Sequence, residues 1–259
     1  MYRLLIFCAF LVWSSSARVL IDSHSNGRII GGIDTSIDKF PFLVSLKFFD
    51  VHRCGGSIYT FNVVLIAANC VLGLSKDYLT ITAGITNLNE QGIEREVKDV
   101  IIHEEYSAWL NANDIALIIL KKSFVYTKTI QAIILASDGE EIPAGTRGSI
   151  AGWSSPDNGE EVQADLRYKD VYTFSKKECA ERYNPYYDIT DDMICAGPAV
   201  GKGGVCYGDF GGPLIIGGRL FGITSFSINC GDRLYPPVFL KISKFRSWIS
   251  EQVEKLELQ

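Results

Sequence analysis

A glycine-rich stretch, Tyr207-Gly208-Asp209-Phe210-Gly211-Gly212-Pro213, holds residue types that can surround a reacting group. Its glycines allow backbone conformations that a Cβ atom forbids, and backbone N–H groups aimed from such a loop can stabilise a developing oxyanion. Phe210, at the centre, carries neither a lone pair nor a transferable proton. It therefore cannot act as a covalent nucleophile, although the residues around it could support one.

Two further stretches carry groups that could act with this loop. Asn69 lies in Ile66-Ala67-Ala68-Asn69-Cys70, and its amide has no titratable nitrogen near neutral pH, so it cannot take a proton from a nucleophile. Asp114 lies in Asn113-Asp114-Ile115-Ala116-Leu117 and offers a carboxylate, which we expect to act as a structural hydrogen-bond acceptor.

These motifs occur in one order along the chain and resemble those of the trypsin/chymotrypsin family of serine proteases. The resemblance covers nearly all of Ile29 to Lys255 and begins at Arg28-Ile29-Ile30-Gly31-Gly32, which is similar to the family's activation junction. It implies that Asn69, Asp114 and Phe210 occupy the positions of the catalytic histidine, aspartate and serine. It also implies that cleavage after Arg28 frees the Ile29 amine to pair with Asp209. The competing interpretation is an accidental Arg-Ile bond in a loop.

The N-terminus predicts secretion. Residues 1–17 combine Arg3, the apolar run Leu4 to Trp13 and a small-residue cleavage site, which is typical of a signal peptide. The apolar run is shorter than the roughly 20 residues needed to cross a bilayer, so we expect no membrane anchor. We predict a short activation segment at 18–28, a single trypsin-like domain at 29–259, and an extracellular, monomeric protein.

The chain has seven cysteines, and assigning Cys8 to the signal leaves an even set of six. An even number in a secreted chain indicates disulfides, whereas zinc binding lacks a Cys-x-x-Cys motif or clustered histidines to support it. The family resemblance implies three nearest-neighbour pairs: Cys54–Cys70, Cys179–Cys195 and Cys206–Cys230.

Short apolar runs separated by glycine and asparagine predict strands, at 42–48, 57–59, 63–67, 79–83, 97–102, 116–120, 148–153, 213–216 and 220–226. This pattern favours a sandwich or barrel over alternating βα units. From Phe245 to Leu256 the apolar residues follow helical spacing, with Ser243 as the expected N-cap and the second barrel as the expected packing surface. The resemblance implies an all-β fold of two packed six-stranded antiparallel β-barrels with a C-terminal α-helix.

The resemblance implies a remodelled specificity pocket, formed by Gly204, Val205, Ser227 and Pro237. Gly204, followed by Val205, stands where trypsins carry an aspartate, so a cationic substrate side chain would lose its counter-charge. Ser227 and Pro237 replace glycines of the pocket walls, and both add volume. We expect a narrowed or filled pocket.

The function hypothesis is that the chain is not an enzyme but a secreted, inactive protease homologue that acts by binding a protein. Losing the serine or histidine of a triad costs about a millionfold in turnover. The chain also resembles inactivated protease paralogues of parasitic mites, and this resemblance implies complement or other host-defence proteins as partners.

Two alternatives remain open. One is a regulatory cofactor or decoy in an active serine protease cascade. The other is a hydrolase with an unconventional nucleophile, for which Thr224 or Ser225 lies near the expected cleft, although no base for it is evident from the sequence.

Cofactors and nucleic acids are not expected. The net charge of −5 lacks the basic footprint of a nucleic-acid binder. A calcium loop is not evident, and Glu90 and Glu94 are interpreted as solvated charges.

Overall fold

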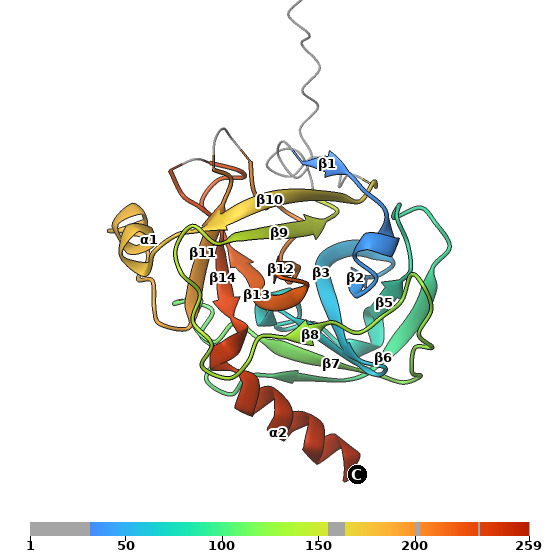
Figure 1. The fold of residues 1–259 in the computed structure, drawn as a ribbon. Coiled ribbons are helices and arrows are strands. Elements are labelled where there is room, and N and C mark those ends of the chain that lie inside the picture. Colours follow the sequence, from blue (N-terminus) through green and yellow to red (C-terminus); the bar gives the residue numbers. More distant parts are fainter. Residues whose placement is uncertain (1–31, 155–163, 200–202, 233, 259) are drawn as a thin grey trace, which may run out of the picture.

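A computed structural model describes residues 32–154, 164–199, 203–232 and 234–258. Within these ranges six antiparallel strands form a first closed barrel, in the order β2-β3-β4-β7-β6-β5 (Figure 1). Its strands are β2 Leu43–Phe48, β3 Val51–Thr60, β4 Val63–Ile66, β5 Leu79–Ala83, β6 Ile93–Ile102 and β7 Ala116–Leu120.

A second ring of six antiparallel strands runs β10-β11-β14-β13-β12-β9, and pairing of β9 with β10 closes it. Its strands are β9 Arg147–Gly152, β10 Arg167–Thr173, β11 Met193–Gly197, β12 Pro213–Ile216, β13 Arg219–Phe226 and β14 Val238–Lys241. Two short strands join its edges: β1 Ile33–Asp34 pairs with β10, and β8 Ile134–Leu135 runs parallel to β13. The predicted two-barrel architecture is confirmed.

Short helices connect or follow the strands of the two barrels. The α-helices are α1 Lys176–Tyr183 and α2 Arg246–Glu257, and the 3₁₀-helices are η1 Ile37–Lys39, η2 Ala68–Cys70, η3 Lys76–Tyr78 and η4 Ile242–Lys244. α1 lies at one end of the second barrel, and α2 extends from the last strand to the C-terminus (Figure 1).

The core explains why these segments become strands. β4 and β7 are buried along their whole length, as expected for continuous apolar runs covered on both faces. One apolar cluster extends from Ile58 and Ile118 in the first barrel to Ile223 and Leu240 in the second. This cluster therefore joins the two barrels, whereas the second barrel also holds separate apolar clusters around Leu214 and around Tyr183.

The three predicted disulfides are present: Cys54–Cys70, Cys179–Cys195 and Cys206–Cys230. Each typically stabilises a fold by about 2–4 kcal/mol, mainly by restricting the unfolded chain. Cys54–Cys70 links β3 to η2, and it therefore fixes the segment that carries Asn69.

The C-terminal helix differs from the prediction in two details. The predicted N-cap Ser243 lies inside η4, and α2 begins at Arg246 after Phe245, because the chain first turns through a 3₁₀ segment. The helix also contacts the first barrel, since Trp248 Nε1 donates to Glu104 Oε2 at 2.9 Å and its ring packs against His103. The apolar stripe itself is confirmed, because its residues all pack on the shared core.

Candidate active site

The candidate site is a cleft of about 630 Å³ whose walls come from both barrels. The first barrel contributes His52 and Asn69, and the second contributes Phe210, Ser225 and other residues of the same wall. Asn69 lies in η2, directly after β4, whereas Ser225 is near the end of β13 and Phe210 is in the loop before β12.

A buried carboxylate behind the cleft connects the two barrels. Asp114 is 1% exposed, and its Oδ1 accepts the Asn69 backbone N–H at 2.8 Å. Its Oδ2 accepts from Asn69 Nδ2 at 2.7 Å and from Ser225 Oγ at 2.5 Å. Asn69 Nδ2 also donates to the Ser225 carbonyl at 2.9 Å. The structure therefore brings Asn69, as donor, and Asp114, as acceptor, together, and adds Ser225 as a further donor.

Burial raises the pKa of Asp114 to about 6, against the opposing effect of the hydrogen bonds from Ser225 and Asn69. A carboxylate with such a pKa can accept a proton near neutral pH more readily than an ordinary aspartate. Ser225 thus has a base within hydrogen-bond reach, which sequence reasoning missed. The two residues are 111 positions apart, and no local pattern in the sequence indicates that they meet.

The glycines of the Phe210 loop are required by close backbone contacts. A Cβ on Gly208 would lie 2.6 Å from the Trp153 carbonyl oxygen, and one on Gly211 would lie 2.5 Å from that of Gly55. Both residues also have positive φ. The Phe210 ring meets the exposed Tyr207 ring edge-to-face at 6.1 Å. Among the described residues, the backbone N–H groups of Gly208 and Phe210 donate to no protein acceptor.

A serine–histidine pair is also present, at positions that the sequence motifs did not indicate. Ser45 Oγ and His52 Nδ1 lie 2.7 Å apart, and His52 Nε2 lies 3.1 Å from the Gly208 carbonyl oxygen. Burial lowers the pKa of His52 to about 4, so its imidazole is neutral at pH 7. His52 borders the cleft, whereas Ser45 has no exposed surface.

Asp209 is buried next to this pair. Its Oδ2 accepts the Cys206 N–H at 3.0 Å, and its Oδ1 has no hydrogen-bond partner among the described residues. Burial raises its pKa to about 7. Arg28 and Ile29 lie outside the described residues, so pairing of the Ile29 amine with Asp209 stays a prediction.

The pocket residues expected from the resemblance are Gly204, Val205, Ser227 and Pro237, and Ser227 directly follows Phe226, which lines the cleft. A Cβ on Gly204 would lie 3.0 Å from Pro237 Cγ, so the proline ring packs directly against residue 204. Val205 is 1% exposed, and Ser227 Oγ donates to the Asn229 carbonyl at 3.3 Å. The close contact of Pro237 with Gly204 supports the expectation of a narrowed pocket, which stays a prediction.

No group of three or more possible metal ligands occurs among the described residues. The two carboxylates considered for calcium have partners: Glu90 Oε2 accepts the Thr86 N–H at 2.8 Å, and Glu94 pairs with Lys47 at 2.7 Å.

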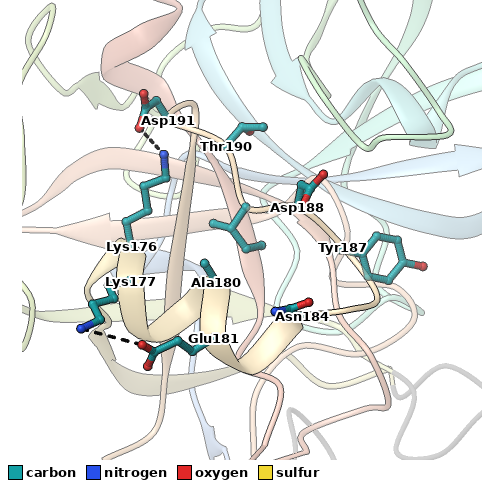
Figure 2. A pocket seen from close by; sticks show the side chains of 10 residues that line it. Lys176, Lys177, Ala180, Glu181, Asn184, Tyr187, Asp188, Thr190 and Asp191 are labelled. Atoms are coloured by element: carbon teal, nitrogen blue, oxygen red, sulfur yellow. Dashed lines mark hydrogen bonds and ion pairs between the residues drawn. The ribbon is translucent and has the colours of Figure 1, made fainter.

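A second hollow lies beside α1 and shares no residue with the cleft (Figure 2). Its two lysines pair with carboxylates, Lys176 with Asp191 and Lys177 with Glu181. It therefore does not present an unpaired lysine to a ligand.

Two packed β-barrels with disulfides inside each barrel, a cleft between them and a buried aspartate behind that cleft define a chymotrypsin-type fold. The family model for trypsin matches residues 29–249, and the chain belongs to the trypsin family. It is 40% identical to trypsin delta of Drosophila erecta, over 86% of this chain and 88% of that protein. It is 34% identical to the vitellin-degrading protease of Bombyx mori, over 90% of this chain and 88% of that protein.

Solved structures support the same membership. Human heparin binding protein has a TM-score of 0.77 and 27% identity, covering 85% of this chain and 95% of the other. Neuropsin, a serine protease of mouse brain, has a TM-score of 0.79 and 28% identity, covering 86% of this chain and 99% of the other. One of these proteins is named for binding and the other for proteolysis, and a fold by itself does not fix an activity.

The comparisons contradict the hypothesis of an inactive homologue that acts only by binding. Relatives at 40% and 34% identity over most of the chain are named as a trypsin and a protease. In addition, the fold contains a serine–histidine hydrogen bond, at Ser45 and His52. The prediction that the chain is not an enzyme is therefore corrected. Substitution at the two motif positions does not establish loss of activity, because folding brings other hydroxyl groups, those of Ser225 and Ser45, within hydrogen-bond reach of a possible base.

The disulfides and the family are typical of extracellular proteins, which agrees with the expected location. None of the helices in the described part of the chain is long and apolar enough to cross a membrane. The signal at 1–17 and the activation segment at 18–28 lie outside the described residues.

Proposed function

We propose that this protein is a trypsin-family peptidase that binds extended peptide segments in the inter-barrel cleft and cleaves them slowly through Ser225. The observation that carries the proposal is the 2.5 Å hydrogen bond from Ser225 Oγ to Asp114 Oδ2 at the cleft wall. Relatives named as proteases support hydrolysis as the reaction class.

The proposed step is nucleophilic acyl transfer. Ser225 Oγ forms a bond to the carbonyl carbon of the peptide, and its proton passes to Asp114, whose raised pKa suits it as a base. As the C–N bond breaks, the proton moves from Asp114 to the leaving amine. Water then hydrolyses the serine ester and releases the acid. The free N–H groups of Gly208 and Phe210, which border the cleft, are the candidate donors to the oxyanion.

The choice of Ser225 over Ser45 follows from access. Both hydroxyls have a base within hydrogen-bond reach, but Ser45 has no exposed surface and does not line the cleft. Ser225 is 3% exposed and does line it. Since no imidazole stands beside Ser225, we expect turnover about a millionfold below that of a complete triad.

The test is covalent labelling with a broad fluorophosphonate probe, followed by mapping of the labelled residue by mass spectrometry. The full chain is examined before and after cleavage at Arg28, beside digestion of a peptide library. We expect slow labelling at Ser225 that Ser225→Ala abolishes. Ser123→Ala is the matched control, because Ser123 is exposed and does not line the cleft, and this variant should label normally.

Two outcomes would overturn the proposal in different ways. Absence of both labelling and cleavage after prolonged incubation would refute peptidase activity. Labelling that survives Ser225→Ala and disappears in Ser45→Ala would move the nucleophile to the Ser45–His52 pair.

The partner class expected from the sequence is also a proposal. The substrate segments would come from extracellular defence or protease-cascade proteins, and a cleaved cascade protein in plasma treated with this chain would support that source. The finer resemblance to protease paralogues of parasitic mites stays a prediction about ancestry.

A further inference from the structure

A charged side chain, that of Arg53, lines the cleft. Among the described residues that line it, Arg53 is the only one with a formal charge at neutral pH, because the His52 imidazole is neutral. The other lining groups are aromatic rings such as Phe48 and Tyr207, amides and a hydroxyl. The protein as a whole is acidic, with a net charge of −5, so this cation contrasts with the rest of the molecule.

The guanidinium of Arg53 is oriented but not neutralised. Its Nε donates to the Cys70 carbonyl at 2.8 Å, and Cys70 is fixed by its disulfide to Cys54. Among the described residues, neither terminal nitrogen of Arg53 makes a hydrogen bond or an ion pair. A guanidinium held through Nε keeps its two terminal N–H groups available, and their planar geometry matches the two oxygens of a carboxylate.

The position of Arg53 places that cation beside the proposed reacting groups. It precedes Cys54 and Gly55 on β3, and the Gly55 N–H donates to the Phe210 carbonyl at 2.9 Å. Its acceptor Cys70 directly follows Asn69, which contacts Asp114 and Ser225. Arg53 therefore lines the same cleft as Ser225 and Phe210, in which the peptide is proposed to bind.

We infer that Arg53 is a specificity-determining residue that selects peptides carrying a carboxylate, either an acidic side chain or a free C-terminus. This inference rests on the proposed use of the cleft for peptides, but it concerns binding and does not depend on cleavage. The neighbouring rings of Phe48 and Tyr207 favour an apolar residue next to that carboxylate.

The test measures binding of fluorescent peptides to the full chain by anisotropy, with three otherwise identical peptides. One has an internal glutamate and an amidated C-terminus, one has glutamine in its place, and one has glutamine and a free C-terminus. We expect the first or the third to bind about tenfold tighter than the amidated glutamine peptide, as one charge-assisted hydrogen-bond pair implies. Which of the two gains affinity identifies the source of the carboxylate.

Arg53→Met should remove this preference while retaining the affinity for the neutral peptide. Arg147→Met is the matched control, because Arg147 is an exposed cation paired with Asp170 outside the cleft, and it should keep the preference. Raising the salt concentration should weaken only the preferred peptide. Equal binding of all three peptides, no measurable binding, or a preference that survives Arg53→Met would overturn the inference.

The two proposals fail separately. Carboxylate preference without fluorophosphonate labelling would refute the peptidase function and leave the Arg53 assignment intact. Labelling at Ser225 without any carboxylate preference would refute the Arg53 assignment and leave the peptidase function intact.

Discussion

Replacing Asp209 by asparagine tests how a buried carboxyl group responds to activation. In the described structure Asp209 is 3% exposed and accepts one hydrogen bond, from the Cys206 N–H, while its other oxygen has none. Burial raises its pKa from the ordinary value of 3.8 to about 7. The folded protein therefore holds this proton more tightly than the unfolded chain does.

The sign of the pH effect follows from that difference. The stabilising contribution of protonated Asp209 is complete below the unfolded pKa and is lost as pH rises through the folded pKa. Between about pH 5 and pH 8, the free energy of unfolding of the uncut wild-type protein should fall by about 3 kcal/mol from this group. Asp209→Asn has no proton to lose, so its stability should not show this fall.

The assay is urea unfolding of uncut wild type, Asp209→Asn and the control Asp50→Asn across that pH range. Asp50 is exposed at a hairpin tip, so its variant should keep the wild-type pH dependence. After cleavage at Arg28, the predicted pairing of the Ile29 amine with Asp209 should remove the fall in wild type as well. Equal pH slopes for uncut wild type and Asp209→Asn would refute the reasoning.

Three further predictions concern the framework of the site. Gly211→Ala should lower the free energy of unfolding by several kcal/mol more than Gly218→Ala does. Both glycines have positive φ, but only at Gly211 would the added Cβ lie 2.5 Å from a carbonyl oxygen. Urea unfolding of both variants measures the difference. Replacing Cys54 and Cys70 together by alanine should cost about 3 kcal/mol in the same assay, and an unchanged midpoint would contradict it. Trp248→Phe should cost about 1 kcal/mol through loss of the bond to Glu104, and Glu104→Gln in the Trp248→Phe background should then have little added effect.

The barrels could be predicted from sequence because their strands are marked locally. β5, β7 and β12 lie at the predicted positions, since uninterrupted or alternating apolar runs bounded by turns leave little choice of structure. β10, β11 and β14 were not predicted. β10 is polar in sequence, Arg-Tyr-Lys-Asp-Val-Tyr-Thr, and it forms a strand because β1, β9 and β11 offer it backbone partners.

Only those residues of the candidate site that lie in contiguous sequence motifs could be predicted from the sequence. Contiguous motifs predict three site residues: Asn69, Asp114 and Phe210. In the structure Asn69 and Phe210 line the cleft, and Asp114 is buried behind it. Ser225 with Asp114, and Ser45 with His52, bring together groups from different strands, which no spacing along the chain reveals. Motif positions alone therefore predict inactivity wrongly, because they do not show which hydroxyl groups folding places near a base.

The hydrogen-bond requirements of the buried Asp114 carboxylate explain which residues surround it. Asp114 needs donors on both oxygens, because an unsatisfied buried acceptor costs about 1–3 kcal/mol and a charged one more. The Asn69 backbone and amide N–H groups supply one donor to each oxygen, and Ser225 supplies the third. Asparagine at position 69 thus preserves the hydrogen bonding that holds the barrels together across the cleft, but it supplies no titratable group. A proton leaving Ser225 must then pass to Asp114, and for this reason the raised pKa of Asp114 and its contact with Ser225 decide what chemistry Ser225 can perform.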